Sequence, residues 1–154
     1  MIHLSILVFF PVVCSLLGAF NPRVIGIVAT LIPLVYAVML VADFDPAGGL
    51  QHVTDDAWIP ELGIRYKLGI DGLNLWLILL TTVVAFACAV WLAVRPVQER
   101  GGLFTFHMAL GETAVLGAFV AQDLALFVLF FDLMLVPFYF LVGQWGGQDR
   151  VRPR

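Results

Sequence analysis

The chain has 154 residues, of which 62% are hydrophobic and only 12% are charged, and its formal net charge is −3. A soluble domain typically carries about a quarter charged residues, and a soluble core of this size cannot bury so much apolar surface. The composition therefore predicts lipid as the solvent. It excludes a nucleic-acid-binding surface, because the Lys and Arg residues form no long run.

Five apolar stretches are long enough for a membrane-spanning helix, which needs roughly 20 mostly apolar residues. In chain order they cover residues 2–20, 24–42, 73–94, 103–121 and 123–142. The first has no basic residue before its apolar run and no small-x-small cleavage site, so we interpret it as a span and not as a signal peptide. The sequence thus predicts an all-α, polytopic transmembrane helix bundle with five spans.

The connections between these stretches alternate in length and character. Residues 21–23 contain Asn and Pro, which favour a tight turn between the first two spans. A hydrophilic segment, 43–72, separates the second and third spans, and residues 95–102 join the third to the fourth. Residues 121–123 form a very short link between the last two spans, which predicts an antiparallel helical hairpin.

The charges in these connections predict an orientation. One side of the membrane receives six basic residues: Arg23, Arg95, Arg100, Arg150, Arg152 and Arg154. The other side receives two basic and six acidic residues: Arg65, Lys67, Asp43, Asp45, Asp55, Asp56, Glu61 and Asp71. By the positive-inside rule, the arginine-rich side and the C-terminus are cytoplasmic, whereas the N-terminus and the loop 43–72 lie outside.

Three ionisable residues fall inside the predicted spans and away from their ends: His107, Glu112 and Asp132. Such groups are costly in hydrocarbon and usually functional. Glu112 and Asp132 each lie ten residues from Gln122, about 15 Å along a helix, so an antiparallel hairpin brings both carboxyl groups to one depth near the bilayer centre. The sequence leaves open whether they face each other. If they do, like charge disfavours joint ionisation, and the pair could hold and pass a proton.

Each of these residues also has a purely structural interpretation. A membrane carboxyl can serve as a protonated hydrogen-bond donor between helices, which suits Glu112 better than Asp132. His107 has two possible roles, packing between helices and relaying a proton. Pro137, five residues after Asp132, cannot donate to the carbonyl of Leu133, so a bend and a free acceptor are expected beside the acid.

Stretch 103–121 carries small residues four positions apart, in the pairs Ala114/Ala118 and Gly117/Ala121. Small residues at this spacing let helix backbones approach closely. We therefore expect tight helix packing along this stretch.

No motif for a cofactor is visible. Cys14 and Cys88 both lie within apolar runs, as buried cysteines usually do, and form no CxxC pair. A phosphate-binding loop, a dinucleotide fingerprint and a paired-histidine ligand pattern are also missing from the sequence. We expect no cofactor, no metal site and no direct NADH binding in this chain, so that any redox chemistry occurs on another chain.

Two segments resemble a known family. Residues 58–75 contain the block Ile-Asp-Gly-Leu, and residues 123–142 contain Met-Leu-Val-Pro-Phe-Tyr-Phe. Together they resemble subunit M, or chain 4, of bacterial NADH–quinone oxidoreductase, which is respiratory complex I. That family is related to the large subunits of Mrp-type antiporters.

The resemblance implies a membrane-arm subunit that couples electron transfer to proton translocation in the bacterial inner (plasma) membrane. Its implied partners are the other membrane subunits of complex I, with quinone bound elsewhere in the complex. In that family a glutamate on the fifth helix, just before the Met-Leu-x-Pro block, is implicated in proton translocation and pairs with a lysine on a later helix. The matching residue here is Asp132, whose side chain is one methylene shorter. The resemblance implies no comparable role for Glu112 or His107, which remain candidate proton relays.

Members of the family are several times longer, with further helices downstream. The resemblance therefore implies that residues 1–154 are an N-terminal part, truncated before those helices and inactive alone. Two alternatives stay open: a subunit of a Mrp-type cation/proton antiporter, and a non-transporting membrane scaffold in which Asp132 and Glu112 only hold helices together.

Overall fold

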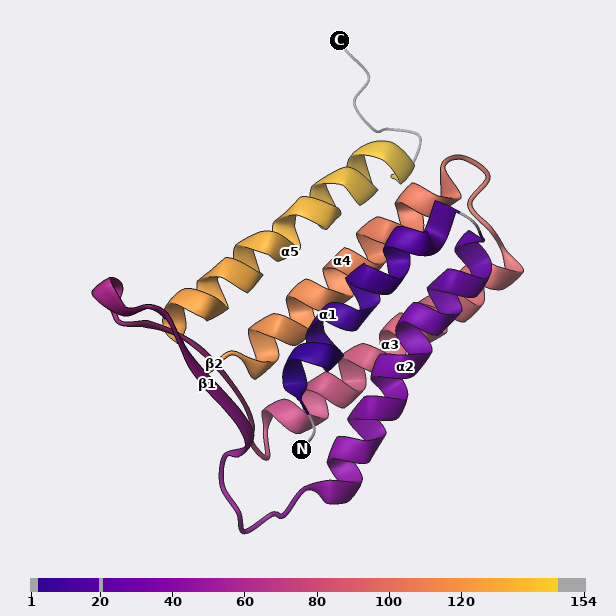
Figure 1. The fold of residues 1–154 in the computed structure, drawn as a ribbon. Helices are drawn as coiled ribbons and strands as arrows, with labels where there is room; N and C mark the ends of the chain where they lie inside the picture. Colours follow the sequence, from indigo (N-terminus) through magenta and orange to yellow (C-terminus); the bar gives the residue numbers. More distant parts are fainter. Residues whose placement is uncertain (1–2, 20, 147–154) are drawn as a thin grey trace.

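A computed structural model of the chain describes residues 3–19 and 21–146. Within them, five α-helices lie side by side (Figure 1): α1 (Leu4–Ser15), α2 (Pro22–Asp43), α3 (Asn74–Val94), α4 (Gly101–Val120) and α5 (Leu124–Trp145). Two short 3-10 helices, η1 (Leu16–Ala19) and η2 (Pro60–Leu62), and two strands, β1 (Gln51–Ile59) and β2 (Ile64–Ile70), complete the described elements.

Four of these helices, α2 to α5, are long and apolar enough to cross a membrane. Their bounds differ from the predicted spans 24–42, 73–94, 103–121 and 123–142 by three residues at most. The predicted first span, 2–20, contains instead the 12-residue helix α1 followed by η1. A helix of 12 residues is about 18 Å long, too short by itself for a hydrocarbon core of about 30 Å. That α1 crosses the membrane, and that the N-terminus lies outside, therefore stay predictions.

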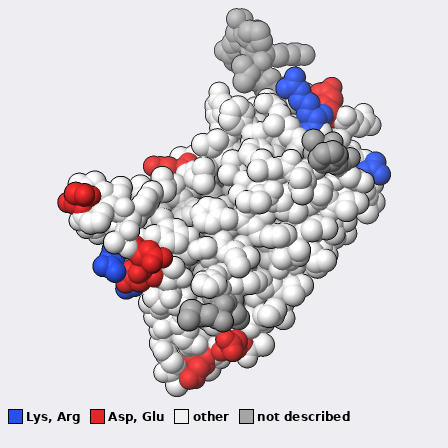
Figure 2. All heavy atoms as spheres, viewed as in Figure 1, with Lys and Arg blue, Asp and Glu red and all other residues white. Residues whose placement is uncertain are grey.

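The connections meet at two opposite ends of the bundle. At one end, the indole Nε1 of Trp145 donates to the carbonyl oxygen of Glu99 at 3.0 Å, which joins the end of α5 to the α3–α4 loop. Figure 2 shows charged atoms mainly at the two ends of the visible face, with one acidic group at the edge beside α5 between them. This separation agrees with the predicted alternation for the described loops, while Arg150, Arg152 and Arg154 lie outside the described residues.

The all-α prediction is wrong in one respect, because the loop 43–72 contains a two-stranded antiparallel sheet. Residues 51–59 pair with 64–70, and Gly63 adopts the left-handed conformation (φ 67°) that ends η2 at the tip of the hairpin. Glycine has no Cβ to oppose that conformation. Figure 1 shows the hairpin crossing one end of the helices and projecting beyond α5.

The hairpin is fixed to the helices along β2. The backbone N–H of Gln122, in the α4–α5 link, donates to the carbonyl oxygen of Lys67 at 2.8 Å. Leu68 and Ile70 are fully buried in the core. The strand therefore covers the end of the bundle and closes it with a backbone hydrogen bond as well as apolar contact.

Helix α4 is the central element. In its most apolar stretch 44% is buried, against 17% in α3 and in α5. Small residues permit this packing, as predicted: a Cβ at Gly117 would overlap the ring of Phe130 on α5. The core around α4 comprises Leu4, Leu7, Val8, Ala37, Leu40, Leu68, Ile70, Leu75, Ile78, Leu116, Val120, Leu126 and Phe130.

Candidate functional site

His107, Glu112 and Asp132 have three different surroundings in the structure. Glu112 is buried and lines a cavity between α2, α3 and α4. His107 packs against aromatic rings of α5. Asp132 is exposed on α5. Glu112 and Asp132, which the sequence placed at one depth, thus face different environments.

Glu112 is the most unusual of the three. Its residue is only 5% exposed, and neither Oε1 nor Oε2 has a hydrogen-bond partner among the described residues. Buried polar atoms nearly always have a partner, because burying an unpaired one costs free energy and burying an unpaired charge costs more. A buried carboxyl group that no side chain satisfies is typical of a site where the group has a chemical task.

The cavity beside Glu112 has a volume of about 410 Å³. It begins at the exposed residues Asn21, Arg23 and Pro96, at the end of the bundle that holds the α3–α4 loop. It ends among buried residues that include Thr30 and Glu112. Its wall also contains Pro22, Gly26, Ala29, Ala85, Ala89, Leu92, Ala93, Val97, Gly101, Phe104, Thr105, Met108 and Ala109.

Helix geometry explains how one face of α4 reaches this cavity. Thr105, Ala109 and Glu112 are spaced by four and three residues, which places them on one side of a helix. Thr105 donates to the carbonyl oxygen of Gly101 at 3.0 Å, and Thr30 on α2 donates to that of Gly26 at 3.0 Å. Both hydroxyl groups keep lone pairs that can accept a further hydrogen bond. Neither threonine was predicted as a site residue, although Thr105 lies seven residues before Glu112, a spacing that places both on one face of a helix.

Asp132 does not meet Glu112. It lies on the outward face of α5, among exposed apolar residues of the same face: Val128, Leu135, Val136 and Tyr139. Pro137 is buried on the other side of α5, where a Cβ at Gly111 of α4 would lie 3.8 Å from its ring. The carboxyl group of Glu112 therefore lines the cavity between α2, α3 and α4, whereas that of Asp132 lies on the outer surface of α5.

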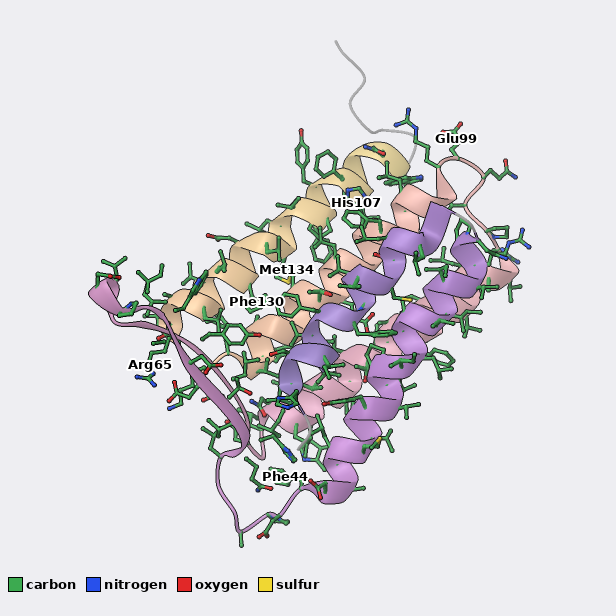
Figure 3. The ribbon with its side chains drawn as sticks, viewed as in Figure 1. Phe44, Arg65, Glu99, His107, Phe130 and Met134 are labelled. Carbon is green, nitrogen blue, oxygen red and sulfur yellow. The ribbon has the colours of Figure 1, made fainter. Side chains whose placement is uncertain are left out.

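His107 lies between α4 and α5 near the end of the bundle that holds the α3–α4 loop (Figure 3). Its Nδ1 is 2.8 Å from the carbonyl oxygen of Leu103, one turn earlier on the same helix. The ring centroid is 5.1 Å from that of Phe140 and 6.0 Å from that of Trp145. These contacts are those of a packed aromatic residue, while a role as a proton relay stays a prediction.

A polar junction that was not predicted from the sequence joins the hairpin to the helices. Asn74, at the start of α3, donates from Nδ2 to the carbonyl oxygens of Gly69 (2.9 Å) and Phe119 (3.1 Å). Its Oδ1 accepts from the backbone N–H of Asp71 at 2.8 Å, and Oδ1 of Asp71 accepts from that of Asn74 at 2.8 Å. The Ile-Asp-Gly-Leu block is followed directly by Asn74, so this part of the sequence forms a structural junction.

Asp123 caps α5 at the same end. Its carboxylate accepts hydrogen bonds from the backbone N–H groups of Arg65, Ala125 and Leu126. These bonds, first that from Arg65, hold the pKa of Asp123 below its ordinary value. The residue stabilises both the helix N-terminus and its contact with β2.

Comparisons with known proteins find relatives over most of the chain. The chain is 36% identical over 134 residues to NADH-quinone oxidoreductase subunit M of Rhodobacter capsulatus, covering 85% of this chain and 25% of that protein. It is 32% identical over 158 residues to NADH-ubiquinone oxidoreductase chain 4 of Arabidopsis thaliana, covering 96% and 31%. No protein-family model matches.

The fold agrees with the same relatives. It superposes on a chain of respiratory complex I from Thermus thermophilus with bound NADH at a TM-score of 0.82 and 28% identity, covering 96% of this chain and 30% of that one. The candidate spans, the central buried helix and this likeness define a multi-pass membrane protein of the kind found in complex I. In particular, the chain is homologous to subunit M, also named chain 4, of the NADH–quinone oxidoreductases. It spans about a quarter to a third of the length of these relatives.

Proposed function

We propose that this chain is part of a proton-translocating membrane-arm subunit of an NADH–quinone oxidoreductase in a bacterial inner membrane. It would work with the other membrane subunits of that complex, while NADH and quinone bind elsewhere. The homology to subunit M supports the assignment. The relatives reported above are quinone oxidoreductase subunits, which favours this function over that of a Mrp-type antiporter.

The observation that carries the proposal is the placement of Asp132 in the middle of an exposed apolar face of α5. A carboxylate that faces lipid is costly, so such residues face a protein partner or a hydrated cavity. The relatives are three to four times longer than the part that this chain matches. A later helix of such a protein can cover this face and bring a basic residue to Asp132, as the resemblance implies.

In this arrangement Asp132 would change its proton affinity when the charge on its partner changes. A basic partner nearby favours the carboxylate, and its withdrawal or neutralisation favours the protonated acid. One proton would be taken up and released in each cycle. Asp132 itself performs no redox chemistry in this proposal.

The test uses a chimera in which the part of this chain that aligns with the Rhodobacter capsulatus subunit M, over 134 aligned residues, replaces its counterpart there. In inside-out membrane vesicles we expect NADH-driven proton uptake by the chimera, a fall of about tenfold or more with Asp132→Asn, and substantial retention with Asp132→Glu. The assembled complex is measured in parallel by native gel electrophoresis.

Two results would overturn the proposal. The first is a chimera that does not assemble with the other complex I subunits. The second is an assembled Asp132→Asn variant whose proton uptake equals that of the parent, which would support a scaffold role for Asp132.

A further inference from the structure

We propose that the cavity lined by α2, α3 and α4 is a water-filled half-channel that connects the Glu112 carboxyl group to the membrane surface on the Arg23 side. The inference that the cavity holds water rests on the structure alone. Its purpose, the loading of a proton on Glu112, rests on the proposed function.

The shape of the cavity supports the connection. Its lining runs from the exposed residues Asn21 and Arg23 at the start of α2 to the buried residues Thr30 and Glu112. Glu112 is 11 residues after Gly101, which also lines the cavity, so the lining follows α4 for about 16 Å. That length is about half of a hydrocarbon core of about 30 Å. The cavity thus extends to about mid-membrane depth from the end of the bundle that holds the α3–α4 loop.

The chemistry of the lining favours water over an acyl chain. A purely apolar cavity stays dry, whereas water enters a cavity that offers it polar partners. Here both oxygens of Glu112 lack a described partner, and the hydroxyl groups of Thr30 and Thr105 can still accept hydrogen bonds. A volume of about 410 Å³ has room for several water molecules. An acyl chain in the same space would leave the carboxyl group unsatisfied.

Small residues keep the passage open. Ala85, Ala89 and Ala93, on one side of α3, and Gly26 and Ala29 on α2 line the wall. Larger side chains at these positions would close the space between the helices. A proton that arrives as hydronium can then pass to the Glu112 carboxylate, leaving a water molecule behind, and the reverse step returns it.

Cysteine labelling tests the hydration without any transport measurement. The native cysteines are first replaced (Cys14→Ala, Cys88→Ala), and a single cysteine is then introduced by Ala89→Cys. The matched control is Ala87→Cys, two residues away on α3, at an exposed position that does not line the cavity. A charged, membrane-impermeant methanethiosulfonate is added to one side of proteoliposomes at a time.

We expect the Ala89→Cys protein to react from the Arg23 side only, and at least about tenfold faster than the Ala87→Cys protein, because the reagent needs water to reach the thiolate. No reaction from either side, or equal rates for the two proteins, overturns the proposal. If spin-labelled lipid chains contact Ala89→Cys and the charged reagent does not, the cavity holds lipid and the proposal is also wrong.

Infrared spectroscopy tests the end of the channel. The carboxyl band of Glu112, assigned by its loss in Glu112→Gln, should shift in heavy water within the dead time of solvent exchange. Ala89→Leu, which narrows the cavity, should slow this shift at least about tenfold, whereas Ala87→Leu should not. An equally fast shift in all three proteins would show that water reaches Glu112 by another path and would overturn the assignment.

The two proposals can fail separately. Loss of proton uptake in Asp132→Asn together with an unreactive Ala89→Cys protein would leave the proposed function standing and remove the half-channel. Normal proton uptake in Asp132→Asn together with one-sided labelling of Ala89→Cys would remove the proposed function and leave the hydrated cavity standing.

Discussion

The ring of Phe130 on α5 occupies the space that a side chain would need at Gly117 on α4. Phe130 is 3% exposed and belongs to the core, so the ring has no free surface to move to. This contact fixes the distance and rotation of the two helices that carry Glu112 and Asp132. It also gives the small-residue spacing of α4 a specific structural role.

Gly117→Ala should therefore lower the free energy of unfolding by about 1–3 kcal/mol, the usual cost of overpacking a well-filled core. SDS titration of the detergent-solubilised chain measures it. The control is Gly143→Ala on α5, where a Cβ meets nothing within 4 Å and no loss is expected. Equal stability of the two variants would contradict this packing.

Asn74→Asp should loosen the hairpin. The variant keeps the side-chain oxygen that accepts from Asp71 but loses the donors to the carbonyl oxygens of Gly69 and Phe119. A buried acceptor without its donor costs about 1–3 kcal/mol. Amide hydrogen exchange in β2 should become faster, while exchange in the middle of α2 should not change. Unchanged protection of β2 would show that the hairpin is held by its apolar contacts alone.

The capping of α5 by Asp123 should make stability depend on pH. The folded protein holds the pKa of this carboxyl group below its ordinary value, so the folded state favours the carboxylate. The stabilisation is present above the ordinary Asp pKa and is lost as the pH falls through the lower, folded-state value.

Unfolding of the solubilised chain, compared between about pH 6 and pH 3, measures this effect. The difference between the parent and Asp123→Asn should shrink as the pH falls. Glu61→Gln, an exposed change at the tip of the hairpin, serves as the control. A difference that grows toward low pH would have the wrong sign and would refute the capping argument.

The ring contacts of His107 permit a direct comparison of its two interpretations. His107→Phe keeps a planar aromatic ring beside Phe140 and Trp145, slightly larger than imidazole, and removes the two ring nitrogens. If packing is the role, the variant of the chimera should assemble and retain most of its NADH-driven proton uptake. Loss of uptake with normal assembly would instead support the predicted relay.

Some of the fold could be predicted because hydropathy records the length of buried or lipid-facing helices directly. The four longest helices begin and end within three residues of the apolar stretches. The hairpin was missed because its strands, of nine and seven residues, mix polar with apolar residues and form no long apolar run. Its one fully buried end, Leu68 to Ile70, is too brief to stand out in a search for apolar runs.

The site could be predicted in part. The sequence identified Glu112, Asp132 and His107 as the ionisable groups inside apolar stretches, because each interrupts a run of lipid-like residues. It did not decide which way each one faces. The apolar side chains of α4 are distributed around the whole helix, so no polar stripe in its sequence indicates which face is buried.

Sequence alone thus determined that the chain is a bundle of apolar helices with carboxyl groups at mid-length, because each residue's transfer energy from water is a local property. Only the tertiary structure decided that Glu112 faces a cavity, that Asp132 faces outward and that a hairpin closes one end. Those outcomes depend on which helix faces pack against one another. Gly117 and Phe130, for example, lie on different helices, so their packing cannot be read from the sequence of either helix alone.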